Sequence, residues 1–311
     1  MTPNAPNIAA IDVGSSATRL VVAHVGPRGP TPIYRQRAPI RLGTEVFAYG
    51  RIGEESQRLL VQAFVDLSKR LSAHQVVAYR AVATSALRDA ANGQQVLEAV
   101  HAHSGIRVQL ISGDEEAELM RQALLGAVTR HGEPEPASDT LLLDLGGGSL
   151  ELMRADGSSV QSLPMGTVRL LGQYPALQKP MSAHDVVHLS ERFVAELGAH
   201  LGPVAPAPLA LGTGGNVDAM AQGLPGGRPG GLPSLHVDAL LPAACALGPL
   251  PLSVRAKSFG LHHGRADLLL PAVLIVHAVG ALFGVRDIMV PGAGIRDALL
   301  ARLCQELTPG G

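Results

Sequence analysis

The sequence predicts an α/β protein made of two related halves with a cleft between them, and three observations support this prediction. The chain has 311 residues, which is long enough for two domains of ordinary size. Apolar, strand-like runs alternate with helical patterns, as is typical of α/β layering. An apolar run, an aspartate, a glycine loop with serine and a second apolar run occur in this order twice, within 8–25 and within 139–153.

Short apolar runs predict the strands, and amphipathic patterns predict the helices. In the first half, the expected strands are 8–13, 17–25, 76–83 and 106–111, and the expected helices are 54–72, a short piece from Ser85, 93–104 and a helix that begins after Ser112. In the second half, two strands flank the glycine loop within 139–153, two more are expected at 208–212 and 286–290, and helices are expected at 183–200, 265–283 and 293–307. Residues 223–233 are rich in Pro and Gly and predict a loop.

We place the domain division at the end of the helix that begins after Ser112. This gives an N-terminal domain of residues 1–126 and a C-terminal domain of residues 127–311. The last helix, about 293–311, can pack back onto the first domain.

Composition excludes several classes of protein. The net charge of −1 provides no overall field that would attract nucleic acid or an anionic membrane, and aromatic residues make up only 3% of the chain. No uninterrupted apolar run reaches the roughly 20 residues of a membrane span, and no signal-peptide pattern opens the sequence. Cys245 and Cys304 lack the spacing of a disulfide framework or a zinc site. We therefore expect a soluble, cytoplasmic protein with no nucleic-acid or membrane partner.

Three glycine-rich loops, each following an apolar run, indicate phosphate binding. They are Gly14-Ser15-Ser16, Gly146-Gly147-Gly148-Ser149 and Gly212–Gly215, which includes Gly214. Glycine allows several backbone N–H groups to converge closely on a phosphate. A single loop of this kind also fits an ordinary hairpin turn, but three together favour a phosphate cleft. None has the P-loop or Rossmann pattern.

Three carboxylates, Asp12, Asp144 and Glu151, lie at the edges of the first two loops. Bare carboxylates would repel a phosphate, whereas Mg²⁺ binds through one or two carboxylates together with water and phosphate oxygens. We expect Asp144 and Glu151 to be direct ligands and Asp12 to act through water. The alternative is that each carboxylate caps a turn or lies at the surface.

Glu116 is the candidate general base. Ser112 and Glu115 fit a helix capping box, so Glu115 has a structural task. The apolar stripe of the same helix, formed by Leu119, Met120, Ala123, Leu124 and Ala127, continues back to Glu116. Glu116 should therefore point inward, where a carboxylate needs a partner or a function. The alternative is a carboxylate at the rim that stabilises the helix dipole.

The chain resembles the exopolyphosphatase and guanosine pentaphosphate phosphohydrolase (Ppx/GppA) family. The matching stretches are AAIDVGSSATRLVV, AVATSALRDAAN, LISGDEEAEL, LLLDLGGGSLELM, LPMGTVRL, LGTGGNVDAM, and RADLLLPAVLIVHAV followed by GIRDALL. The resemblance implies two actin, Hsp70 and sugar-kinase-like (ribonuclease H-like) domains, in the short two-domain form of the family. Three places depart from the family pattern: Ser16, Leu150 and Val290-Pro291-Gly292.

The resemblance also assigns roles to residues. It implies that Glu116 activates the attacking water, that Asp144 and Glu151 hold Mg²⁺ or Mn²⁺, and that the protein is a homodimer. The implied substrate-binding residues are Gly14, Ser15, Gly146, Gly147, Gly148 and Ser149 in the loops, and Arg19, Arg88 and Arg265 as phosphate contacts. Ser16 and Gly214 join this set as members of the glycine-rich loops.

The expected activity is that of an exopolyphosphatase, which hydrolyses the terminal phosphate of inorganic polyphosphate and releases orthophosphate. The alternative within the same chemistry is a pppGpp 5′-phosphohydrolase. A sugar or acetate kinase fits less well, because Glu116 suits a water-activating role. A nucleotide-regulated, actin-like binding protein is the alternative from a different class.

Overall fold

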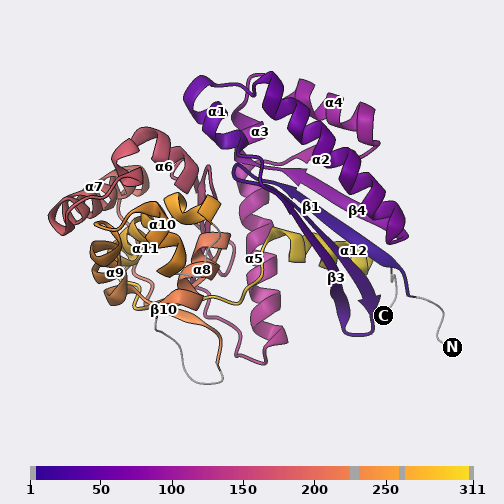
Figure 1. The fold of residues 1–311 in the computed structure, drawn as a ribbon. Helices are drawn as coiled ribbons and strands as arrows, with labels where there is room; N and C mark the ends of the chain where they lie inside the picture. Colours follow the sequence, from indigo (N-terminus) through magenta and orange to yellow (C-terminus); the bar gives the residue numbers. More distant parts are fainter. Residues whose placement is uncertain (1–4, 225–230, 259–262, 308–311) are drawn as a thin grey trace. The chain divides into compact units, whose positions relative to one another are not determined.

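The computed structural model of the chain describes residues 5–224, 231–258 and 263–307. The chain forms two compact units, each with its own mixed sheet (Figure 1). One unit contains Met1–Leu119 and Gly294–Gly311, and the other contains Met120–Ala293. The division lies inside α5 (Gly113–Arg130) rather than at residue 126, and the C-terminal segment belongs to the unit that also contains the N-terminus.

The first unit is built on a five-stranded sheet of order β3-β2-β1-β4-β5. Its strands are β1 (Asn7–Val13), β2 (Thr18–Gly26), β3 (Gly29–Ala38), β4 (Val76–Ala83) and β5 (Gln109–Leu110). Its helices are α1 (Leu42–Tyr49), α2 (Glu54–Ala73), α3 (Ser85–Asp89), α4 (Gly93–Ser104), the start of α5, and α12 (Ile295–Leu307). β1 runs antiparallel to β2 and parallel to β4.

The two faces of this sheet are covered by different helices. Ala9, Ile11 and Val13 of β1 join one buried apolar cluster with side chains of α2 and α4. Because side chains alternate along a strand, Asp12 points to the opposite face. There α12 contacts β1 and donates from Arg296 to the Asp12 carboxylate. The charged face of the sheet is therefore the face that α12 covers.

The second unit repeats this topology with one additional strand. Its sheet has the order β10-β11-β9-β6-β7-β8. Its strands are β6 (Leu141–Leu145), β7 (Leu150–Arg154), β8 (Gln161–Leu163), β9 (Leu209–Thr213), β10 (Ser234–His236) and β11 (Asp287–Met289). β6 runs antiparallel to β7 and parallel to β9, as β1 does to β2 and β4. The duplication predicted from the two glycine loops is confirmed at the level of topology.

Helices surround the second sheet. They are α6 (Thr167–Gln173), η1 (Pro175–Gln178), α7 (Ala183–Leu201), α8 (Gly215–Gly223), η2 (Val237–Ala239), α9 (Leu240–Leu247), α10 (Leu252–Ser258), η3 (His263–Leu268) and α11 (Leu269–Phe283). α11 contacts α7 and α9 and is buried over most of its length. Residues Ala266–Phe283 are long and apolar enough to span a membrane by length and composition alone, but 78% of this window is buried. That burial is what a core helix of a folded domain shows.

Arg255 of α10 has a structural role that the sequence did not reveal. Its side chain is fully buried, and burial lowers the pKa of its guanidinium. It donates to backbone carbonyls at 2.8 to 3.1 Å, those of Leu177, Lys179, Leu247, Gly248 and Leu250. The guanidinium therefore ties the η1 segment to the C-terminal end of α9, where carbonyl dipoles favour a cation.

Replacement of Arg255 by Ala should lower the free energy of unfolding of the second unit by about 3–5 kcal/mol, because the carbonyls around it would lose their donors. Urea denaturation followed by circular dichroism would measure this change. Arg192→Ala, which removes an exposed ion pair with Glu196 on α7, is the matched control and should change stability far less. Equal effects of the two substitutions would contradict the assigned role.

Candidate functional site

The two glycine loops close by the same hydrogen bond. In the first loop, the Gly14 N–H donates to the Ala17 carbonyl at 3.1 Å, and in the second, the Gly146 N–H donates to the Ser149 carbonyl at 3.1 Å. Each bond closes the hairpin between two antiparallel strands, β1 with β2 and β6 with β7. The two loops are therefore structurally equivalent. Each is an ordinary hairpin turn, and being such a turn does not conflict with binding phosphate.

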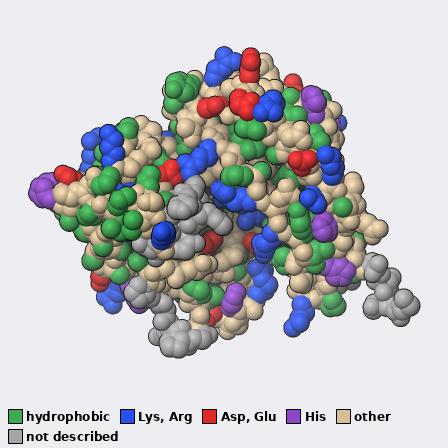
Figure 2. Space-filling model, in the orientation of Figure 1, with side chains coloured by type: hydrophobic (Ala, Val, Ile, Leu, Met, Phe, Trp, Pro, Cys, Tyr) green, Lys and Arg blue, Asp and Glu red, His purple; other side chains and the backbone are tan. Residues whose placement is uncertain are grey.

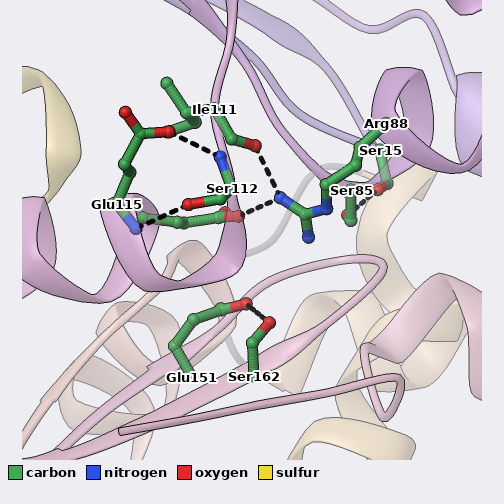
Figure 3. A network of polar contacts seen from close by, with 9 residues as sticks. Ser15, Ser85, Arg88, Ile111, Ser112, Glu115, Glu151 and Ser162 are labelled. Atoms are coloured by element: carbon green, nitrogen blue, oxygen red, sulfur yellow. Dashed lines mark hydrogen bonds and ion pairs between the residues drawn. The ribbon is translucent and has the colours of Figure 1, made fainter.

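The first loop is held by α1 and α3. The Ser15 hydroxyl lies 2.9 Å from that of Ser85, at the start of α3 (Figure 3), and the Ser15 carbonyl accepts from the Gly43 N–H at 2.9 Å. A Cβ at Gly43 would lie 2.8 Å from the Cβ of Ser15, so only glycine allows this approach. Ser15 is buried, and its hydroxyl is engaged with that of Ser85.

The second loop is held by the N-terminus of α6. The Thr167 N–H donates to the Gly146 carbonyl at 3.1 Å, and the Val168 N–H donates to the Gly147 carbonyl at 2.7 Å. The Arg169 Nε donates to the Gly148 carbonyl at 2.8 Å. With the carbonyls of the loop bonded to α6, its N–H groups are oriented away from that helix. Such an arrangement favours an anion.

The third glycine loop passes close to the second. Gly214 has φ +112°, and a Cβ there would lie 2.5 Å from the Leu145 carbonyl oxygen and 3.2 Å from Asp144 Oδ1. Gly214 also caps the N-terminus of α8. The structure therefore brings Gly214, Asp144 and the second glycine loop together within one unit.

Asp144 and Glu151 are direct partners across the β6–β7 hairpin. Residues directly opposite on antiparallel strands project their side chains to the same face, and like charges in that position are destabilising. Glu151 is fully buried, and its Oε1 accepts from the Ser162 hydroxyl at 3.1 Å (Figure 3). The pair fits a divalent cation that keeps water and phosphate oxygens as its other ligands. No group of three or more His, Cys, Asp or Glu side chains forms a ready metal site in the described part of the chain.

Asp12 occupies the position in the first hairpin that Asp144 has in the second, but its partner there is Arg19 instead of a carboxylate. The Oδ2 atom of Asp12 lies 3.3 Å from Arg19 Nη1 and 3.2 Å from Arg296 Nη1. Two guanidiniums already balance its charge. The environment of Asp12 therefore does not call for a metal ion, and its predicted role through water remains a prediction.

Glu116 lies at the start of α5. The predicted capping box before it is confirmed, because the Ser112 N–H donates to Glu115 Oε2 at 2.8 Å and the Glu115 N–H donates to Ser112 Oγ at 3.1 Å (Figure 3). Glu115 is exposed and Glu116 is buried, as the helix-face argument predicted. Arg88 Nη1 lies 3.2 Å from Glu116 Oε2 and 3.0 Å from the Ile111 carbonyl oxygen. Arg88 thus orients the candidate base, and its predicted contact with phosphate stays a prediction.

The predicted site residues therefore form two groups, one in each unit. The first unit holds Asp12, Gly14, Ser15, Ser16, Arg19, Arg88 and Glu116, and the second holds Asp144, Gly146, Gly147, Gly148, Ser149, Glu151 and Gly214. The side chain of Arg265 lies outside the described residues.

The model of the Ppx/GppA phosphatase family matches residues 21–221. The chain belongs to this family. Exopolyphosphatase 2 of Mycobacterium tuberculosis is 30% identical over 289 residues, which cover 86% of this chain and 88% of that protein. The family resemblance inferred from SGDEEA and DLGGGSLE is confirmed.

Two solved structures support the fold of this Ppx/GppA protein. The Aquifex aeolicus member of the Ppx/GppA family has a TM-score of 0.77 at 24% identity, covering 98% of this chain and 99% of the other. An exopolyphosphatase from Cytophaga hutchinsonii has a TM-score of 0.79 at 22% identity, covering 98% and 100%. The predicted α/β class, with two related mixed sheets, is confirmed.

Sequence reasoning missed two groups of residues in this Ppx/GppA protein. The first is Gly166 and the start of α6, although LPMGTVRL carried part of the family resemblance. The second is the set of arginines that accompany the predicted Arg19 on and beside the first sheet, described below. Gly166, three residues before Arg169, is a weak signal in the sequence. Its importance depends on its contact with Gly147 and Gly148, about twenty residues earlier.

Gly166→Ala should reduce phosphatase kcat/KM by at least about 100-fold, because the new Cβ would lie 2.3–2.4 Å from backbone atoms of Gly147 and Gly148 and would displace the loop donors. Steady-state kinetics would measure the loss. Gly172→Ala in the same helix is the control, since nothing lies within 4 Å of its added Cβ. Wild-type kinetics for Gly166→Ala would refute the role of α6 in shaping the loop.

Proposed function

We propose that this Ppx/GppA phosphatase is an exopolyphosphatase, which removes the terminal phosphate of inorganic polyphosphate and releases orthophosphate. The observation that carries the proposal is the direct pairing of Asp144 with Glu151 beside a glycine loop whose carbonyls are bonded to α6. A pair of acids next to anion-binding N–H groups suits a metal ion bound together with phosphate oxygens. The exopolyphosphatase names of its relatives in Mycobacterium support the choice of substrate.

In the proposed reaction, water attacks the terminal phosphorus in line with the bridging oxygen. Glu116 orients the water and accepts its proton, and Arg88 holds the Glu116 carboxylate in place. The N–H groups of the loops stabilise the negative charge on the oxygens of the transferred phosphoryl group. The phosphoanhydride P–O bond breaks, and the bridging oxygen leaves with the polyphosphate, which is now shorter by one phosphate.

Asp144 and Glu151 are the residues that would hold Mg²⁺ or Mn²⁺. When bound, such an ion supplies Lewis-acid stabilisation of the phosphoryl oxygens. Without an ion, these two carboxylates would repel a phosphate, so their placement is compatible with substrate only when their charge is balanced.

Purified protein should release orthophosphate from long-chain polyphosphate in the presence of Mg²⁺ or Mn²⁺, and Glu116→Gln should lower kcat about 10²–10⁴-fold with little change in KM. Glu115→Gln is the neighbouring control, because glutamine still completes a capping box. Release from pppGpp but not from polyphosphate would instead identify a pppGpp phosphohydrolase. An unchanged kcat for Glu116→Gln would remove Glu116 from the mechanism.

Asp144→Asn should raise the half-saturating concentration of the activating metal by at least about tenfold, since one of two charged ligands is lost. Calorimetric titration with Mn²⁺ would detect the same loss independently of turnover. Asp139→Asn changes an exposed carboxylate just before the opposite end of β6 and should leave metal binding unaltered. Metal affinity that is the same in both variants would place the ion elsewhere.

A further inference from the structure

The charged face of the first sheet carries a row of arginines that begins next to the first glycine loop. Asp12 of β1 is opposite Arg19 of β2, and Arg19 is opposite Arg37 of β3. Arg35 lies two residues along β3, opposite Val21. Because residues directly opposite share a face and residues two apart on a strand do so too, Arg19, Arg37 and Arg35 project to the same side.

Two further arginines join this row at its ends. Arg296, at the start of α12, donates to Asp12 from the helix that covers this face. Arg41 directly precedes α1 and lies close enough to Arg37 for their charges to interact. The carboxylates whose charges act on Arg296 are Asp12 and Asp297, while Arg80 on the same face is already paired with Glu306. Arg19, Arg35, Arg37 and Arg296 thus bring several positive charges together in a chain of net charge −1. We call Arg19, Arg35, Arg37, Arg41 and Arg296 the arginine strip.

The arginines of the strip repel one another. Partial loss of hydration, followed by the charges of Arg19 and Arg41, lowers the pKa of Arg37. Burial also lowers the pKa of Arg296, and the charges of Arg19 and Arg35 add to that effect while Asp12 opposes it. Arg35 and Arg37 are exposed on an edge strand. Such repulsion would be relieved by a bound polyanion. Figure 2 shows Lys and Arg side chains gathered in groups on the face in view.

We propose that Arg35 and Arg37 bind the phosphates that follow the terminal one, so that the arginine strip guides a long polyphosphate chain away from the first glycine loop. This proposal rests on the proposed function and narrows its substrate to long chains. Arg35 and Arg37 are about 7 Å apart along the strand, from the ordinary rise per residue, so they would contact separate phosphates. Arginine can bind phosphate oxygens through two parallel N–H groups, which suits a linear polyanion.

Charged side chains on an edge strand can also serve only to prevent pairing with another chain. That function would need no particular spacing and no partner on other elements. The arginine strip instead includes side chains from β2, β3, the start of α12 and the residue before α1, and its Arg19 lies beside the first glycine loop. The convergence of residues from four places in the sequence favours a ligand.

The test compares the double variant Arg35→Gln/Arg37→Gln with Lys69→Gln/Arg70→Gln, which removes the same charge from α2 on the opposite face of the sheet. Both pairs are introduced into Glu116→Gln protein, and binding of long-chain polyphosphate and of tripolyphosphate is measured by calorimetry at several salt concentrations. Thermal denaturation establishes that each variant folds.

We expect the strip variant to lose about 100-fold in affinity for long-chain polyphosphate, about tenfold for each arginine, and to lose at least tenfold less for tripolyphosphate. Its binding should also depend less on salt, because fewer counterions are displaced. The α2 variant should bind both ligands as the parent does. An equal loss for both ligands, no loss, or the same loss in the α2 variant would overturn the proposal.

The outcome is separable from that of the proposed function. If the wild-type protein binds long chains through the strip but releases no orthophosphate, the proposed hydrolysis fails while the strip remains a polyphosphate site. If orthophosphate is released and the strip variant still binds long-chain polyphosphate and tripolyphosphate with the affinities of its parent, the proposed hydrolysis stands and the strip proposal fails.

Discussion

Two acidic side chains, Asp144 and Glu151, face each other across the β6–β7 hairpin, and this pairing depends on the register of the two strands. A slip by one residue would send the two carboxylates to opposite faces of the sheet. The same register sets the position of the second glycine loop, and that loop contacts α6 and Gly214 at distances that permit only glycine. The geometry of the second unit's candidate site therefore follows from one hairpin, and the repulsion between its acids is the reason for proposing a cation there.

The first hairpin has the same closure and topology but the opposite electrostatics. Arg19 stands where the second hairpin has Glu151, so Asp12 is paired with a cation of the protein itself. In the function proposed above, one copy of the duplicated motif would attract anions by arginine and the other with the help of a metal ion. Two loops of similar sequence thus differ in the charge opposite their aspartate.

Local features could be predicted from the sequence. These features depend on residues that are close together in sequence. They are the strands around both loops, the capping box of Ser112 and Glu115, and the inward orientation of Glu116. Features set by distant packing could not be predicted. β3 is largely exposed and contains Pro30 and Pro32, so it gives no apolar signal. Arg296 meets Asp12 across 284 residues, and Arg255 is recognisable only from the carbonyls that surround it.

The first unit is assembled from both ends of the chain, because α12 packs on the sheet that β1 and β2 begin. During synthesis, the strands of the first unit emerge early but cannot complete their packing until α12 has been made. The second unit, in contrast, is continuous in sequence. Since domains fold as units while the chain is made, the second unit can fold first, as an insertion within a first unit that is still incomplete. Asp12 then acquires Arg296 only after the whole second unit has been made, so loss of α12 would leave the first unit incomplete.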